Sequence, residues 1–171
     1  MLPVISVVGR HNAGKTTLVE KLIRALRDRG LHLGTIKHDA HGFEIDVPGK
    51  DSYRHRQAGA EWVAIVSPTR LAVVEERKRP PSIEQLVEAA SAWAPQLDLL
   101  LTEGYKAGAY PKVEVVQTKL STDLLCQNDP MLWAVACDQP LDGVHVPCFD
   151  WNDGEALTAF LLDRLQVQGR R

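Results

Sequence analysis

Apolar residues near the start of the chain follow first a strand pattern and then a helical one. Residues 4–8 form a mostly β-branched apolar run, which is typical of a strand buried in a parallel sheet. Between Lys15 and Arg29 the apolar residues recur at helical spacing, which predicts an amphipathic helix. Gly30 ends this helix because glycine readily adopts the left-handed conformation found after helices. Residues 31–37 follow as a strand, so the chain opens with a β-loop-α-β unit.

The middle of the chain interrupts this order with a polar stretch and a hairpin. Residues 38–52 are rich in charged and turn-forming residues, which excludes them from a core, and a brief helix is expected at 54–58. Two strand-like runs, 62–66 and 71–74, are separated by only four residues. A connection that short permits only antiparallel pairing, so the sequence predicts a β-hairpin here.

Helices and strands alternate again after a basic, proline-terminated loop at residues 77–81. A capping box beginning at Ser82 starts a helix that reaches about Trp93, and Asp153 caps a final helix. The strands expected between these helices lie at 97–102, 112–116, 131–137 and, as a short edge strand, 145–146. This alternation predicts an α/β fold of three layers, with a mostly parallel sheet and an antiparallel β-hairpin extension.

Composition and charge limit the classes of protein to which this chain could belong. The chain has 171 residues, of which 44% are hydrophobic, and this suits one domain with a sizeable core. A formal net charge of −2 argues against a general nucleic-acid binder. Cys126, Cys137 and Cys148 are odd in number and lack C-x-x-C spacing, so neither a disulfide framework nor a structural zinc site is indicated.

Targeting signals are not expected either. The first three residues run directly into the first strand, which leaves no room for a signal peptide. No stretch of about twenty apolar residues appears, so the sequence predicts no membrane span. These two observations predict a cytoplasmic protein.

Residues 9–17, Gly-Arg-His-Asn-Ala-Gly-Lys-Thr-Thr, match the phosphate-binding loop G-x-x-x-x-G-K-[ST] at every required position. The motif lies between a predicted strand and a predicted helix, as its chemistry requires. A polyphosphate packs against main-chain N–H groups at the start of the helix, so side chains must be absent where the loop bends. The sequence therefore predicts a P-loop NTPase fold, with residues 1–171 as a single nucleotide-binding domain. The nucleotide contacts expected from the motif are Gly9, His11, Asn12, Ala13, Gly14, Lys15, Thr16 and Thr17.

Catalysis at such a loop requires a cation, a metal ligand and an acidic partner. Lys15 would reach the β- and γ-phosphate oxygens, and the Thr16 hydroxyl would bind Mg²⁺. Ligands of parallel sheets bind beyond the carboxyl ends of the strands, where Glu103 lies. Asp98 would lie roughly 16 Å from that edge at the usual rise per residue of a strand. Glu103 is therefore the favoured metal and catalytic partner, and Asp98 a residue that starts the strand.

Two further acids follow the second strand, which ends at the same edge. Asp39 and Asp46 could contact the metal-bound water in place of Glu103 or together with it. The alternative is that both belong to a solvated polar loop. Asp46 joins Lys15 and Glu103 in the predicted catalytic set, and joins Thr16 and Glu103 in the predicted metal site. Spacing alone does not decide between these alternatives.

The residues that would recognise the base are less clearly marked. Residues 117–121 occupy the place where GTPases often carry Asn-Lys-x-Asp, but here the first residue is Gln and the last is Ser. Asp138 follows the next predicted strand at the same edge, and its carboxylate can accept from the guanine N1–H and N2–H groups. Asp138 can equally serve as a loop cap, and both interpretations stay open.

Three histidines close to the predicted site receive no assigned role. His38 and His41 are three residues apart in a loop, which is weak evidence for a metal site and more typical of surface or phosphate contacts. His11 lies inside the phosphate loop, so its ring must point toward the phosphates or toward another protein group.

Taken together with the phosphate loop, four further motifs resemble those of a known family, molybdopterin-guanine dinucleotide biosynthesis protein B (MobB), of the SIMIBI class of P-loop GTP-binding proteins. The resemblance covers Val4 to about Asp138, and the Asp-x-Pro-Gly-Lys-Asp-Ser run is more specific than the phosphate loop alone. The motifs that carry it are Thr35–His38, Asp46–Arg54, Gly59–Ala60 and Glu103–Lys106.

The resemblance implies a GTP-binding accessory protein with weak GTPase activity, which assists a MobA-type guanylyltransferase in forming molybdopterin guanine dinucleotide. It implies GTP and Mg²⁺ as cofactors, a homodimer to which the hairpin contributes, and no partnership with nucleic acid or membrane. Lys50 and Arg54 fall in the second signature and Lys106 in the third. With Lys37 and Lys112, these cations are expected near the phosphate edge, where they would suit a second anionic ligand such as the molybdopterin phosphate or the product of the partner. Scattered surface lysines are the alternative interpretation, and it stays open.

Two other functions fit a phosphate loop. A free-standing small-molecule kinase would need an arginine-rich lid, but the only arginine-dense stretch, residues 77–79, runs into two prolines and suits a stiff loop. A regulatory switch would order its polar loop on binding GTP and recruit a partner without chemistry. The loop 38–51 offers acids but no evident water-positioning glutamine, which is consistent with slow hydrolysis.

Overall fold

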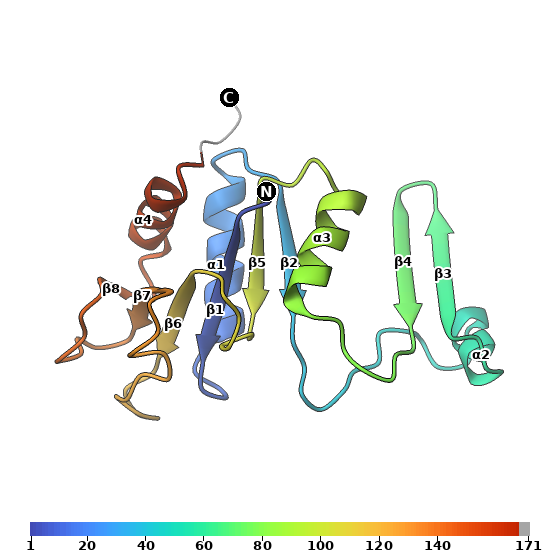
Figure 1. Cartoon of the computed structure of the whole chain (residues 1–171), viewed down its shortest axis with the longest axis horizontal. Helices are drawn as coiled ribbons and strands as arrows, with labels where there is room; N and C mark the ends of the chain where they lie inside the picture. Colours follow the sequence, from blue (N-terminus) through green and yellow to red (C-terminus); the bar gives the residue numbers. More distant parts are fainter. Residues whose placement is uncertain (168–171) are drawn as a thin grey trace. The chain divides into compact units, whose positions relative to one another are not determined.

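The computed structural model describes residues 1–167 and contains two separate sheets (Figure 1). All neighbouring strands of the larger sheet pair in parallel, in the order β2-β5-β1-β6-β7-β8. These strands are β1 (Val4–Gly9), β2 (Leu33–Lys37), β5 (Leu99–Glu103), β6 (Lys112–Val116), β7 (Leu132–Cys137) and β8 (Cys148–Asp150). The helices that accompany this sheet are α1 (Lys15–Arg27), α3 (Ile83–Trp93) and α4 (Gly154–Leu165).

The second sheet is the antiparallel hairpin that the four-residue connection predicts. It consists of β3 (Trp62–Ser67) and β4 (Arg70–Glu75), with the short helix α2 (Asp51–Gln57) before it. The chain divides into two compact units: residues 39–82 form the small one, and residues 1–38 with the chain from Ile83 onward form the large one. The α/β class with a hairpin extension is confirmed, while the assignment of the whole chain to a single nucleotide-binding domain stays a prediction.

Alternation along β1 explains why the large unit has three layers. Ile5 and Val7 point to the face covered by α1 and α4, and they pack with the buried leucines of those helices. Val4 points to the opposite face and packs with Ile83 and Val87 of α3. Figure 1 shows α3 on the near face of the sheet and α1 on the far face. Because both faces are covered, the central strands are apolar along nearly their whole length.

The structure corrects several predicted boundaries: α2 is Asp51–Gln57 instead of 54–58, β5 is Leu99–Glu103 instead of 97–102, and β8 and the end of α1 also differ. The edge strand lies at Cys148–Asp150 instead of 145–146. Val135 of β7 is paired with Cys148 in the sheet, and the Val135 N–H donates to the Pro147 carbonyl. Helix α1 ends at Arg27, two residues early, and the Leu31 N–H donates to the carbonyl of Leu26. The position of β8 and the end of α1 are therefore set by main-chain hydrogen bonds, which the spacing of apolar residues does not predict.

No helix among the described residues is long and apolar enough to cross a membrane.

A buried carboxylate fixes the long connection between β6 and β7. Glu114 is 1% exposed and accepts hydrogen bonds from the main-chain N–H groups of Leu125, at 2.6 Å, and Cys126, at 2.9 Å. Lys112, on the same face of β6, is equally buried and donates to Asp129 at 2.9 Å. These contacts hold two points of the connection against the sheet, and the hydrogen bond from Lys112 lowers the pKa of Asp129.

Replacing Glu114 should therefore destabilise the fold strongly. In Glu114→Ala the two N–H groups lose their acceptor, and we expect the free energy of unfolding to fall by about 3 kcal/mol in urea denaturation. Glu20→Ala is the matched control, because Glu20 is exposed and pairs only with Arg24 on the surface of α1. Equal losses in the two variants would contradict the anchoring role of Glu114.

Candidate functional site

The phosphate loop bends where its backbone requires glycine. Gly9 has a φ of +147°, and a Cβ added there would lie 2.6 Å from the carbonyl oxygen of Val115 in β6. Gly14 has a φ of +94° and is the N-terminal cap of α1, without a side-chain hydrogen bond to the helix. The first turn of α1 contains no acidic residue. Unscreened N–H groups at a helix start favour an anion, so the loop has the backbone geometry of a phosphate site.

An aromatic side chain supports this loop from the other end of the chain. The ring of Trp151 would lie 3.4 Å from a Cβ added at Gly14. Lys21 of α1 donates to the Trp151 carbonyl and to the Asn152 side chain, both at 3.0 Å, which ties this turn to the helix. Sequence reasoning missed Trp151, because a contact between residues more than 130 positions apart leaves no mark in local spacing.

Lys15 lies over its own loop. Its ammonium group donates to the carbonyl oxygens of Arg10, at 2.7 Å, and Gly9, at 3.2 Å. These two hydrogen bonds hold the charge over the loop, and the expected contact of Lys15 with the β- and γ-phosphates stays a prediction. The remaining motif residues are contiguous in this loop: Ala13 is buried, whereas His11, Asn12, Thr16 and Thr17 are exposed.

The structure brings together Thr16 and Glu103, which are 87 residues apart. The Thr16 hydroxyl lies 2.9 and 3.0 Å from the two carboxylate oxygens of Glu103, and the Lys37 ammonium lies 3.7 Å from one of them. The Gly104 N–H donates to the Val7 carbonyl, which fixes the end of β5 beside β1. A hydroxyl and a carboxylate are hard oxygen donors of the kind that Mg²⁺ takes beside phosphate oxygens and water.

Asp98 lies at the opposite end of the same strand. Its carboxylate accepts the His32 N–H at 2.8 Å, just before β5 begins. Glu103 is therefore the acid of this strand that meets the phosphate loop. Its assigned metal and catalytic roles stay predictions.

Asp46 belongs to a buried ionic cluster of the small unit. Its carboxylate accepts from Ser52 Oγ and from the Val47 N–H, both at 2.9 Å, and lies 3.7 Å from Nε of Arg56. Arg56, whose side chain is 9% exposed, also pairs with Glu44 and Glu76. These hydrogen bonds lower the pKa of Glu44 and raise that of Arg56.

This cluster joins α2, the preceding loop and the end of β4 within the small unit. One carboxylate oxygen of Asp46 and Nε of Arg56 are buried without a hydrogen bond. Lys50 and Arg54 of the same signature are exposed, and Arg54 lies 4.0 Å from Asp51. Asp39 is exposed and accepts the His41 N–H at 2.9 Å. No observation tests Asp46, Lys50 or Arg54 as ligands.

Asp138 and the loop after β6 meet at the carboxyl edge of the sheet. One carboxylate oxygen of Asp138 accepts the Thr118 N–H at 2.8 Å, and this hydrogen bond lowers the pKa of Asp138. The loop-cap contact considered from the sequence is therefore present. Lys106 is exposed in the loop after β5. Lys112 is buried and paired with Asp129, so its expected place among the cations of the phosphate edge is wrong.

Within residues 1–167, no group of three or more His, Cys, Asp or Glu side chains is placed to hold a metal ion. His38 instead packs its ring against Tyr105, with ring centroids 5.1 Å apart. Any metal at the phosphate loop would therefore depend on nucleotide oxygens and water beside Thr16 and Glu103, which is the usual arrangement for Mg²⁺.

Comparison with known proteins agrees with this geometry. The family model described as MobB, molybdopterin guanine dinucleotide synthesis protein B, matches residues 4–138. The molybdopterin-guanine dinucleotide biosynthesis adapter protein of Escherichia coli is 35% identical over 171 residues, covering 98% of this chain and 96% of its own. The protein of the same name from Haemophilus influenzae is 34% identical over 141 residues, covering 82% of this chain and 78% of its own.

Solved structures extend the likeness to the fold. A MobB protein homolog from Bacillus stearothermophilus superposes with a TM-score of 0.74 at 27% identity, covering 95% of this chain and 97% of its own. Bacillus subtilis MobB superposes with a TM-score of 0.73 at 28% identity, covering 99% of this chain and 100% of its own. The chain therefore belongs to the MobB family.

Proposed function

We propose that this protein is a GTP-binding accessory protein of molybdenum cofactor biosynthesis, which assists a MobA-type guanylyltransferase in forming molybdopterin guanine dinucleotide. The observation that carries the proposal is the phosphate loop, whose Lys15 lies over the loop and whose Thr16 contacts Glu103 from a separate strand. The name of the relatives, adapter protein of molybdopterin-guanine dinucleotide biosynthesis, supports the pathway.

Different groups of the phosphate loop would bind the phosphates and the metal ion of a bound nucleotide. Main-chain N–H groups of residues 13–16 cradle the phosphates, and Lys15 neutralises the β- and γ-oxygens. Thr16 and Glu103 would hold Mg²⁺ or its bound water. The metal supplies charge neutralisation at the phosphates when bound. The loop 38–51 offers no evident glutamine that would position the attacking water, so we expect GTP hydrolysis to be slow.

Base recognition would fall to the loops after β6 and β7. Asp138 already fixes the start of the loop after β6 by accepting the Thr118 N–H through one oxygen. The same carboxylate has further acceptor capacity for the donors of a guanine edge, since an ionised carboxylate offers about four lone-pair sites. The lowered pKa of Asp138 keeps it ionised and therefore an acceptor at neutral pH.

The exposed cations of the family signatures suit a second anionic ligand. In the small unit, Lys50 is the N-terminal cap of α2 and Arg54 lies in the last turn of that helix; in the large unit, Lys106 lies in the loop after β5. Each side chain is exposed and able to meet a phosphate. Within the small unit, we assign the phosphate of molybdopterin to Lys50 and Arg54.

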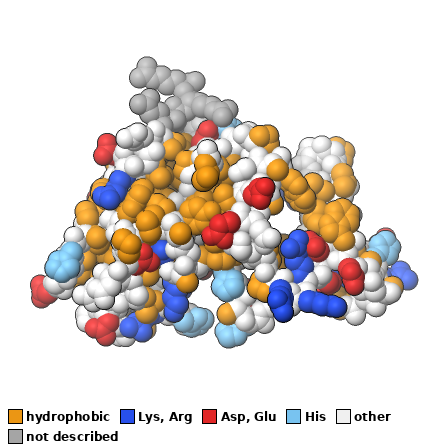
Figure 2. All heavy atoms as spheres, in the orientation of Figure 1, with side chains coloured by type: hydrophobic (Ala, Val, Ile, Leu, Met, Phe, Trp, Pro, Cys, Tyr) orange, Lys and Arg blue, Asp and Glu red, His pale blue; other side chains and the backbone are white. Residues whose placement is uncertain are grey.

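The hairpin supports a homodimer. A two-stranded sheet alone is marginally stable in water. Three large apolar side chains of one hairpin face are exposed: Val66 by 72%, Leu71 by 60% and Trp62 by 57%. Figure 2 shows hydrophobic side chains at the surface over the hairpin. Covering this face with a second copy would remove apolar surface from water and stabilise the hairpin.

Lys15→Ala tests the nucleotide site. The variant loses the cation of the phosphate loop, so we expect GTP affinity to fall at least about 100-fold in isothermal titration calorimetry, while circular dichroism stays unchanged. Arg24→Ala is the control, since Arg24 is an exposed cation further along α1. Normal GTP affinity in folded Lys15→Ala protein would refute the assignment, and tighter binding of ATP than of GTP would refute the base preference.

Glu103→Gln tests the metal assignment separately. The change keeps the size of the side chain but removes its charge, so the gain in GTP affinity on adding Mg²⁺ should fall about tenfold while affinity in EDTA is retained. Thr17→Ala, next to the metal-binding Thr16, is the control and should keep the full Mg²⁺ effect. An unchanged Mg²⁺ effect in Glu103→Gln would exclude this carboxylate from the metal site.

Val66→Asp combined with Leu71→Asp tests the dimer. These residues face each other across the hairpin, and two buried carboxylates would oppose any apolar interface. We expect the mass from sedimentation equilibrium to fall from dimer to monomer. The control, Ser67→Asp with Thr69→Asp, adds the same charge at the turn and should stay dimeric. A dimeric Val66→Asp/Leu71→Asp protein would place the interface elsewhere.

A further inference from the structure

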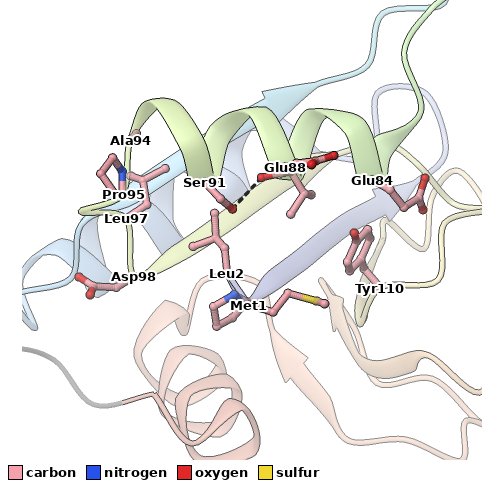
Figure 3. Close-up of a pocket in the computed structure, with 12 residues that line it drawn as sticks. Met1, Leu2, Glu84, Glu88, Ser91, Ala94, Pro95, Leu97, Asp98 and Tyr110 are labelled. Atoms are coloured by element: carbon pink, nitrogen blue, oxygen red, sulfur yellow. Dashed lines mark hydrogen bonds between the residues drawn. The ribbon is translucent and has the colours of Figure 1, made fainter.

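A groove of about 810 Å³ lies beside α3, at the end of the sheet opposite the phosphate loop. Figure 3 shows α3 along one side of this groove, with the start of the chain and Tyr110 along the other. The strand-starting residues Pro3 and Asp98 mark this end of the sheet, since β1 begins at Val4 and β5 at Leu99. The groove is therefore separate from the residues assigned above to nucleotide.

The floor of the groove is apolar. Val87 of α3 is buried, and Leu2 and Leu97 are half-buried and pack on the cluster that Val87 forms with Leu100. Ser91 and Ala94 continue the α3 side with small side chains, and the Ser91 hydroxyl donates to the Val87 carbonyl. The open volume thus lies over a continuous apolar surface that joins the core.

The rim of the groove is acidic. Glu84 and Glu88 are one helical turn apart on the same face of α3, and both line the groove. Asp98 lines the far end, where it also accepts the His32 N–H. The residues that line the groove include no lysine or arginine. This charge pattern disfavours phosphate-bearing ligands and anionic lipid surfaces, and favours a cationic partner.

We propose that this groove docks a basic amphipathic helix of a partner protein. Apolar side chains of that helix would enter the floor, and lysines or arginines spaced by one turn would face Glu84 and Glu88. Helix α3 has 11 residues, and about 1.5 Å of rise per residue gives it a length of roughly 16 Å, which matches three turns of a helix laid alongside it. The proposal does not depend on nucleotide binding.

The probe is a synthetic 14-residue helix with leucines at i, i+3, i+4 and i+7 spacing and lysines elsewhere. Added to the full-length ¹⁵N-labelled protein, it should shift the amide resonances of residues 84–94 and of Leu2. A matched peptide with glutamate at every lysine position should bind at least about tenfold more weakly, because charge complementarity selects the partner. Equal binding of the two peptides, or shifts confined to other elements, would overturn the proposal.

Two variant pairs separate groove binding from general attraction to a cationic peptide. Glu88→Arg should weaken binding of the lysine peptide about tenfold, while Asp163→Arg, an equal charge change on exposed α4, should leave it unchanged. Ala94→Trp fills the groove and should also weaken binding, whereas Ala92→Trp lies on the exposed face of α3. Equal effects within either pair would refute the site.

GTP affinity should be normal in all four of these variants. A failed peptide titration with normal GTP binding would refute the groove alone, and lost GTP binding in wild-type protein would refute the nucleotide site alone.

Discussion

The close approach of β1 and β6 at Gly9 is the constraint on which the phosphate loop depends. The main chain of Val115 lies so near that any Cβ at Gly9 would collide with its carbonyl oxygen. The strand can therefore turn into the loop only through a residue without a side chain, in a conformation that L side chains rarely adopt. After that turn, the loop leads into α1, and the Lys15 ammonium donates back to the carbonyls of Gly9 and Arg10.

Buried polar contacts keep the surrounding segments in place. Glu114 binds two N–H groups of the connection after β6, Asp138 binds its first residues, and Lys21 holds the turn that carries Trp151. Glu114 and Lys21 have no predicted role in binding a ligand, whereas Asp138 also belongs to the proposed base-recognition site. Each satisfies main-chain groups that would otherwise be costly to bury, and so determines where the loops around the site lie.

The two ends of the large sheet differ in chemistry. At the carboxyl end, helix α1 begins without a side-chain cap, Lys15 lies over the phosphate loop, and Thr16 contacts Glu103. At the amino end, α3 contributes Glu84 and Glu88 above an apolar floor. An anion is favoured at the first end and disfavoured at the second. The two ends of the sheet thus differ in charge preference, and we propose nucleotide for the first and a protein segment for the second.

The sequence alone determined the parallel α/β fold, the hairpin, the phosphate-loop motif and the position of Glu103 at the carboxyl edge, with Asp98 at the other end of the strand. These follow from local periodicity, a nine-residue motif and the rule that ligands bind beyond the carboxyl ends of parallel strands. Only the tertiary structure decided the partners of Asp46, the burial of Lys112, the ring of Trp151 against Gly14 and the position of β8. Those features depend on contacts between distant segments, and spacing along the chain carries no record of which distant groups will meet.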